Sequence, residues 1–284
     1  MNILIGLATI IIVIFVIYIL FIIQPKLIDE PSYSYSTIRP FLKTGDIMMF
    51  SCRDHLGGME TFKYYARTSL VDSEYSHVGV VMRDGDRYYV LESTNVDHAG
   101  DSRAQNLNSY GKGGVRIINL DHLIEDYYKA YSGTFGVRFI SKEIPNEILL
   151  KHLESYRECT FDSRSIIIPL AFVDLSLSHK LACKMNEKTA DPSKILCSEF
   201  THEILNKCGV MKDYPSKLFW PFMYDWELFN LYTNVEYSQL YKFVYYRQYK
   251  PILRSKGSPI KSKEKAPQCK TSYSASNAGF WVTN

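Results

Sequence analysis

The segment Lys194-Ile195-Leu196-Cys197-Ser198-Glu199-Phe200-Thr201-His202-Glu203-Ile204-Leu205 decides how the rest of the chain is organised. Its apolar residues recur at helical spacing, and residues suited to a helix cap and first turn precede it at Asp191, Pro192 and Ser193. We therefore expect a helix from about Ser193, with Cys197 in or near its first turn. The free N–H groups and the positive dipole end of a first turn favour a thiolate. Such a cysteine is a nucleophile if a histidine lies beside it, although a free cysteine is more often a small buried apolar residue.

The composition indicates a folded protein with a sizeable core, since 46% of the 284 residues are hydrophobic and 22% are charged. The formal net charge of +3 is too small to indicate a nucleic-acid partner. Six cysteines occur without a C-x-x-C pair or even spacing, which argues against a disulfide framework and a structural zinc site. We expect reduced thiols in a cytosol-facing compartment, and nothing in the sequence requires a metal or an organic cofactor.

The N-terminus is predicted to anchor the protein in a membrane. The run from Ile3 to Ile23 is apolar and uncharged, and a helix of this length spans roughly 31 Å, enough to cross a bilayer. No Lys or Arg precedes the run and no small-x-small cleavage site follows it, so an uncleaved anchor is favoured over a signal peptide. Basic residues follow at Lys26, Arg39 and Lys43, and the positive-inside bias then places the body of the protein on the cytoplasmic side. The sequence thus predicts a single-pass membrane protein with the lipid bilayer as a partner.

Composition along the chain predicts four regions. The anchor occupies residues 1–24, and a linker rich in Pro, Ser and Tyr occupies 25–41. The folded domain occupies 42–250, and the polar, basic tail at 251–284 is expected to be disordered. The domain ends in an aromatic-rich extension, Trp220 to Tyr249, which we expect to pack onto the domain or in part to rest on the membrane surface.

The domain is predicted to belong to the α+β class, with antiparallel strands first and helices later. A Gly45-Asp46 turn leads into the first strand, and Asp84-Gly85-Asp86 has the composition of a hairpin turn. Strands are expected within Leu42–Phe50, Tyr75–Met82, Arg87–Ser93, Gly114–Leu120 and Thr134–Ile140, and a helix within Asn146–Glu158.

Three residues in this arrangement suggest nucleophilic catalysis. His77 lies near the start of the second predicted strand, and Glu92 lies on the strand that the hairpin turn makes its neighbour. If the hairpin pairs in this way, the histidine can take the proton of Cys197 while the carboxylate holds its far ring nitrogen. First-turn N–H groups of the cysteine helix would then help to hold an oxyanion. The resulting hypothesis is a triad of Cys197, His77 and Glu92.

Four motifs occur in one order: Thr44-Gly45-Asp46-Ile47, Ser76-His77-Val78-Gly79-Val80, Val90-Leu91-Glu92-Ser93 and Leu196-Cys197-Ser198-Glu199-Phe200. Their order resembles that of the circularly permuted papain-like proteins of the NlpC superfamily, in the branch with YiiX-like bacterial proteins, poxvirus relatives and lecithin retinol acyltransferase-like enzymes. The resemblance covers roughly residues 42 to 210. It implies a small antiparallel sheet packed against helices, with Cys197 as the nucleophile, His77 as the general base and Glu92 as the residue that orients it. Asp46 is expected to be structural.

The resemblance implies a thiol hydrolase of amides, peptides or lipid esters, or an acyltransferase that carries a fatty acyl group as a thioester. A tethered enzyme is well placed to act on an acyl lipid or a lipid-linked peptide, although the anchor could equally serve only to locate the protein. A rival hypothesis keeps the scaffold without catalysis, as a membrane-anchored interaction or structural protein that uses the aromatic segment and the basic tail for contacts. A viral or microbial source is expected for a membrane-anchored member, and the sequence does not predict an oligomeric state.

Two loop histidines and three basic residues have both a functional and a structural interpretation. His55 either lines a substrate cleft or lies in a solvated loop, and His98 either belongs to a metal site or lies in a loop. For polar loop residues, the solvated loop is the commoner case. The basic residues either contact an anionic head group or form a solvated face; they are Arg103, Lys112 and Arg116.

The cysteine helix carries three further residues with expected structural roles. Glu199 is expected to stabilise its N-terminus, because a carboxylate interacts favourably with the positive end of the dipole. His202 is expected to be a surface or packing residue, and Gly209 is expected to end the helix in the left-handed conformation.

Overall fold

The computed structural model describes residues 33–51, 73–95, 103–108, 113–131, 133–162, 191 and 193–245. All of them belong to one unit, Met1–Arg247, and the second unit, Gln248–Asn284, lies outside the described ranges. The predicted anchor at 1–24 and the basic tail also lie outside them. Within the described ranges, no helix is long and apolar enough to cross a bilayer.

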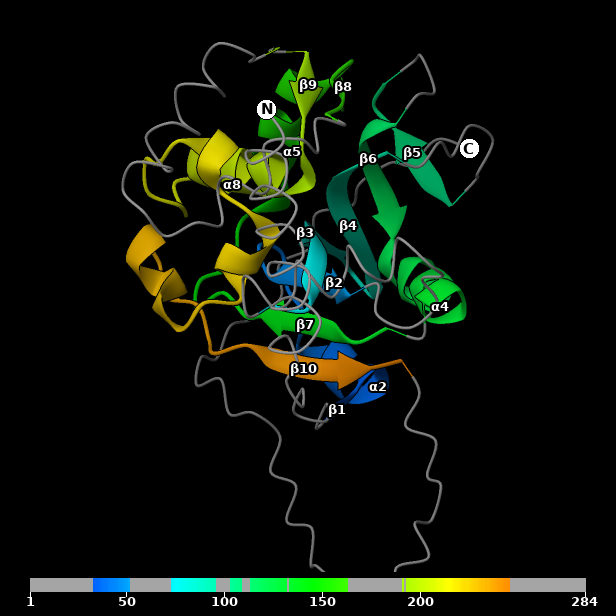
Figure 1. Cartoon of the computed structure of the whole chain (residues 1–284). Coiled ribbons are helices and arrows are strands. Elements are labelled where there is room, and N and C mark those ends of the chain that lie inside the picture. The colour runs from blue at the N-terminus through cyan, green and yellow to red at the C-terminus, as the bar shows by residue number, and fades with distance from the viewer. Residues whose placement is uncertain are drawn as a thin grey trace, which may run out of the picture. The chain divides into compact units, whose positions relative to one another are not determined.

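An eight-stranded sheet forms the centre of the described fold, in the order β1-β10-β7-β2-β3-β4-β6-β5 (Figure 1). The hydrogen-bonded neighbours in it are antiparallel, except that β1 and β10 are parallel. The five predicted strands are present with small shifts at their ends, and the α+β class is confirmed. The strands of this sheet are β1 (Tyr33–Ser34), β2 (Ile47–Ser51), β3 (Tyr75–Asp84), β4 (Arg87–Thr94), β5 (Ala104–Asn106), β6 (Gly114–Asn119), β7 (Phe135–Arg138) and β10 (Tyr241–Val244), and a separate parallel pair is formed by β8 (Thr160–Phe161) and β9 (Lys194–Ile195).

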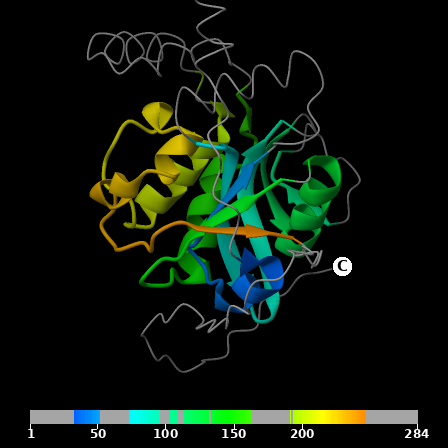
Figure 2. The ribbon, with the colours of Figure 1, turned by 60° about the horizontal axis from the view of Figure 1, so that its bottom comes forward.

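Helices cover both faces of the large sheet (Figure 2). Side chains alternate along β3, so that Val78 and Val80 pack beneath α8 while Val81 packs beneath α4. Helix α4 and the short 3-10 turns after α8 were not predicted from the sequence, and α5 is shorter than the predicted helix. The helices are α2 (Tyr35–Ile38), α4 (Leu120–Tyr131), α5 (Asn146–Leu153) and α8 (Cys197–Lys207), and the 3-10 turns are η1 (Arg39–Phe41), η2 (Glu154–Tyr156), η4 (Ser216–Leu218), η5 (Pro221–Tyr224) and η6 (Glu227–Tyr232).

The predicted hairpin between β3 and β4 is confirmed, with Asp84 opposite Arg87 across the turn. Gly85 in this turn has a φ angle of +59°, a left-handed conformation that glycine adopts without the steric cost of a side chain. The close packing of the two strands depends on Gly79. A Cβ atom there would lie 2.5 Å from Cγ1 of Val90 and 3.3 Å from Cβ of Glu92. Gly79 therefore leaves the space beside the Glu92 side chain open.

The cysteine helix begins later than predicted. Strand β9 occupies its expected first turn, and α8 starts at Cys197 with Leu196 as the cap residue. Asp191 accepts hydrogen bonds from the N–H and the hydroxyl of Ser193, so this pair closes a turn before β9 instead of capping the helix. The correction places Cys197 at the first helical position.

The other predictions about this helix are confirmed. Glu199 accepts a hydrogen bond from the N–H of Leu196 at 3.4 Å and thereby stabilises the N-terminus. Gly209, with a φ angle of +74°, follows directly after the end of the helix. His202 is a packing residue, since it is 2% exposed and its ring centroid lies 4.7 Å from that of Phe219.

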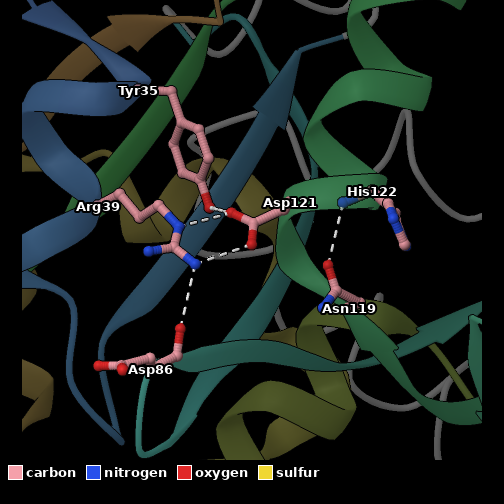
Figure 3. A network of polar contacts seen from close by, with 6 residues as sticks. All are labelled: Tyr35, Arg39, Asp86, Asn119, Asp121 and His122. Carbon is pink, nitrogen blue, oxygen red and sulfur yellow. Dashed lines mark hydrogen bonds and ion pairs between the residues drawn. The ribbon is translucent and has the colours of Figure 1, made fainter.

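Part of the predicted linker is folded, which is a correction. Residues Tyr33–Phe41 form β1, α2 and η1, and Figure 3 shows how they are held against α4. Asp121 accepts a hydrogen bond from the hydroxyl of Tyr35 at 2.7 Å and two from the guanidinium of Arg39 at 2.7 and 2.9 Å. Arg39 also donates to the carbonyl of Asp86 at 3.1 Å. The described domain therefore includes these residues, because a bidentate ion pair and a buried tyrosine fix them to it.

The aromatic-rich segment after α8 packs onto the domain, as the first of its two predicted alternatives states. Its buried side chains include Trp220, Phe222, Met223, Tyr224, Phe229, Tyr237 and Phe243. The buried guanidinium of Arg138 on β7 donates hydrogen bonds to backbone carbonyls of this segment, at Tyr224, Asp225, Trp226 and Ser238. The buried guanidinium thus supplies hydrogen bonds to carbonyls that have no partner in the sheet.

Candidate active site

A buried ionic chain crosses three neighbouring strands, β3, β4 and β6. Nε2 of His77 lies 2.7 Å from Oε2 of Glu92, and Oε1 of Glu92 accepts a hydrogen bond from Nε of Arg116 at 2.8 Å and another from a terminal nitrogen. Glu92 and Arg116 stand opposite each other in the strand register. The exposed fractions are 9% for His77, 0% for Glu92 and 3% for Arg116, so water competes little for these groups.

The charge of Glu92 is fixed by its two cationic neighbours. Burial alone raises the pKa of Glu92, but the charges and hydrogen bonds of His77 and Arg116 bring it to about 2. Glu92 is therefore a carboxylate at neutral pH, and Arg116 occupies the oxygen that His77 does not use. This arrangement fixes the orientation of the carboxylate toward the imidazole.

The side chain of Cys197 is near enough to the His77 ring to raise the pKa of that ring, through charge and hydrogen bonding. Because Nε2 faces Glu92, Nδ1 is the ring nitrogen that remains for the sulfur. Burial lowers the pKa of His77, but the negative charges of Glu92 and Cys197 raise it to about 10. The ring is thus an imidazolium at neutral pH, and an imidazolium next to a cysteine stabilises the thiolate.

Helix α8 positions the cysteine. It packs against both β3 and β4, the two strands that carry His77 and Glu92, and it begins at Cys197. The first-turn N–H groups of a helix have no intrahelical partner, and the positive end of the dipole lies there. The cysteine is 7% exposed. Cys197 therefore stands at the N-terminus of α8, near the histidine and beside the first-turn N–H groups.

Two aromatic rings flank the histidine. The Phe50 ring from β2 lies 5.6 Å from the His77 ring between centroids, and the Tyr127 ring from α4 lies 6.3 Å away at an interplanar angle of 18°. Phe50 is also the strand partner of His77. These rings restrict the rotation of the imidazole, so that its two nitrogens keep facing Glu92 and Cys197.

A viral protein is similar to this chain over most of its length. "Uncharacterized protein R372" of Acanthamoeba polyphaga mimivirus is 38% identical over 227 residues, which are 79% of this chain and 91% of the viral protein. The chain belongs to the family of this mimivirus protein. A mimivirus relative agrees with the viral part of the predicted viral or microbial source.

A solved structure shows a weak likeness to this chain. The crystal structure of the metalloprotein yiiX from Escherichia coli O157:H7 matches it with a TM-score of 0.35 and 16% identity, over 59% of this chain and 67% of that one. A likeness at this level does not transfer a fold or a chemistry. No protein-family model matches the chain, and its predicted place in the NlpC superfamily stays a prediction.

The structure brings the three predicted triad residues together, and their catalytic role stays a prediction. Arg116 requires a correction, because it is buried against Glu92 and belongs neither to a solvated face nor to a head-group contact. Sequence reasoning missed it, since only the pairing of β4 with β6 places it opposite Glu92. Another of the basic residues, Arg103, pairs with Asp126 at 3.1 Å.

The remaining candidates are structural or lie elsewhere. Asp46 has the structural role expected of it, because its carboxylate accepts the N–H groups of Lys43 and Ile140, both at 2.8 Å. His55, His98 and Lys112 lie outside the described residues. In the part of the chain that the structure describes, no group of three or more His, Cys, Asp or Glu side chains is placed to hold a metal ion.

Proposed function

We propose that the chain is a cysteine-dependent hydrolase or acyltransferase on a permuted papain-like scaffold. The observation that carries the proposal is the His77 ring, which bonds to Glu92 through one nitrogen and has the Cys197 side chain near enough to raise its pKa. A structural ion pair needs no cysteine on the free side of the imidazole. A catalytic cysteine must lie beside the free nitrogen of the histidine, and a helix N-terminus favours its thiolate.

The first half of the reaction transfers the acyl group to sulfur. The thiolate of Cys197 attacks the acyl carbon, and the carbonyl electrons move to an oxyanion that first-turn N–H groups of α8 stabilise. When the oxyanion collapses, the bond to the leaving amine or alcohol breaks. The leaving group takes its proton from the His77 imidazolium, and a thioester on Cys197 remains.

The second half uses the change in charge at the sulfur. A thioester is neutral, so it no longer contributes the negative charge that helps to raise the pKa of His77. The imidazole can then accept a proton from water, or from an acceptor alcohol or amine, as that nucleophile attacks the thioester. The sulfur leaves as a thiolate, and the imidazolium–thiolate pair is restored. Glu92 and Arg116 hold the ring in place through both halves.

The substrate class follows from the predicted anchor. A catalytic domain that follows an N-terminal membrane span works close to the bilayer surface, where acyl lipids and lipid-linked peptides are concentrated. We therefore place its substrate among these two classes, with an ester, amide or thioester as the bond that is attacked. The domain faces the cytoplasm if the positive-inside bias holds.

A direct test is to trap the thioester. The full-length chain in mild detergent is treated with p-nitrophenyl acetate and p-nitrophenyl laurate, and the acylated peptides are identified by mass spectrometry. We expect a burst of p-nitrophenolate together with an acyl group on Cys197 that hydroxylamine removes. The Cys197→Ser variant is expected to lose both signals. Cys159→Ser and Cys208→Ser are matched controls that keep them, because burial raises the pKa of both of these thiols.

The opposite result would support the non-catalytic rival. If no acyl group forms on Cys197 and the Cys197→Ser variant releases p-nitrophenolate at the same rate, the proposed activity is wrong. The exposed apolar side chains after α8 would then suggest a contact surface instead; Leu228 is 64% exposed and Leu231 is 63% exposed.

A further inference from the structure

The backbone just before the cysteine is bonded to the strand that carries Glu92. The hydroxyl of Ser93 donates a hydrogen bond of 2.8 Å to the carbonyl of Ile195, two residues before Cys197. Ser93 is fully buried and directly follows Glu92 on β4. One strand therefore holds both the carboxylate that orients the histidine and a hydroxyl that fixes the approach to the nucleophile.

The backbone just after the cysteine is bonded to a residue from the segment that follows α8. The hydroxyl of Tyr224 donates a hydrogen bond of 2.9 Å to the carbonyl of Ser198, the residue that follows Cys197. Tyr224 is fully buried, and its turn η5 packs against β3, the strand of His77. Burial and the nearby negative charge of Cys197 both raise the pKa of Tyr224, which agrees with a phenol close to the sulfur.

The Tyr224 hydroxyl is itself held in place. The carbonyl of Tyr224 accepts a hydrogen bond from Nε of the buried Arg138 at 2.5 Å, and Nη2 of Arg138 donates to the carbonyls of Asp225 and Trp226. The tyrosine ring also contacts Phe219 with centroids 4.9 Å apart. Tyr224 therefore links the central sheet, through Arg138 on β7, to the first turn of α8 and fixes their relative position.

We propose that Ser93 and Tyr224 are positioning residues for the nucleophile, which hold the backbone on both sides of Cys197 so that its sulfur faces His77. The inference rests on the proposed function, because it concerns the same cysteine. Its physical basis is that a nucleophile must be held to within a fraction of an ångström of its productive position. Two hydrogen bonds to the carbonyls of Ile195 and Ser198, one on each side of Cys197, supply that restraint. Neither hydroxyl bonds to the reacting atoms, so both residues act through the main chain.

The test compares the reactivity of Cys197 in variants that lose one hydroxyl. The full-length chain is alkylated with iodoacetamide at pH 5, and the modified Cys197 peptide is quantified over time by mass spectrometry. We expect Tyr224→Phe and Ser93→Ala each to slow the modification about fivefold, the factor that one lost hydrogen bond typically gives. Ser93→Thr keeps the hydroxyl and is expected to restore most of the rate.

Tyr237→Phe is the matched control. Tyr237 is 2% exposed, and its hydroxyl donates a hydrogen bond of 2.9 Å to the carbonyl of Gly45, away from the site. This variant removes the same kind of buried hydrogen bond as Tyr224→Phe. The melting temperatures of the two variants should therefore fall by similar amounts, while only Tyr224→Phe slows the alkylation of Cys197. Equal alkylation rates in these two variants would overturn the positioning role. An unaltered chain whose Cys197 already reacts like an ordinary thiol would instead contradict the proposed function. If Tyr224→Phe does not fold, Ser93→Ala against Ser93→Thr decides the question.

Discussion

Replacing His77 by alanine is expected to slow the alkylation of Cys197 by iodoacetamide about 30-fold at pH 5. An ordinary thiol is less than about 0.1% ionised at this pH. The His77 imidazolium, whose pKa is about 10, persists throughout the acidic and neutral range, and an adjacent cation favours the thiolate form of a cysteine. The lower intrinsic nucleophilicity of such a thiolate reduces the advantage to the stated factor. Peptide mass spectrometry of the full-length chain measures the rate at Cys197 alone.

The pH dependence separates this effect from a loss of structure. At pH 9 an ordinary thiol is mostly ionised and more nucleophilic, so His77→Ala is expected to react as fast as the unaltered chain or faster. The control is His122→Ala, which removes an exposed histidine of α4 and should leave both rates unchanged. Equal slowing at pH 5 and pH 9 would contradict the ion pair, since it would indicate a change in access to the sulfur.

Replacing Arg116 by methionine is expected to lower the free energy of unfolding by about 3 kcal/mol. The change removes both hydrogen bonds to Oε1 of Glu92 and leaves that oxygen buried without its cation. Methionine is close to arginine in length, so little of the loss comes from a cavity. Urea denaturation of the full-length chain in mild detergent, followed by tryptophan fluorescence, measures the loss.

A double-mutant cycle identifies the cause of that loss. Once Glu92→Gln has removed the negative charge, Arg116→Met is expected to cost at least about 1 kcal/mol less than it does alone, because the uncompensated carboxylate is gone. Costs that add to within about 0.5 kcal/mol would show that Arg116 stabilises the fold independently of Glu92. In that case Arg116 would have no part in orienting the histidine.

The elements with a clear local pattern were predictable from the sequence. The hairpin follows from Asp84-Gly85-Asp86 between a β-branched segment and a segment with two tyrosines and a valine. Its pairing places His77 and Glu92 on one face of adjacent strands. The elements that depend on tertiary contacts were not predictable. Tyr33–Phe41 has the composition of a linker, yet it folds because Asp121, far away in the sequence, binds Tyr35 and Arg39.

The candidate site divides in the same way. Cys197, His77 and Glu92 could be proposed because each has a chemical role that its residue type suggests. Arg116, Ser93 and Tyr224 could not, since arginine on a strand and hydroxyls in apolar segments have many common structural roles. Their relevance depends on strand register and on backbone carbonyls that become neighbours only in the folded chain. The start of α8 was misplaced for a related reason, because the pairing of β9 with β8 overrides the local cap signal at Ser193.

The most direct measurement of the ion pair is the protonation state of His77. The chain holds seven histidines, so nitrogen NMR of the full-length protein labelled with ¹⁵N-histidine gives few signals, and the loss of one pair in His77→Gln assigns it. At pH 8 we expect both ring nitrogens of His77 to carry a proton, because the pKa of this ring is about 10. Cys197→Ala removes one of the two negative charges that hold the proton, so the ring should then become neutral at a lower pH. A neutral His77 ring at pH 8 in the unaltered chain, with no change on replacing Cys197, would contradict the thiolate–imidazolium pair.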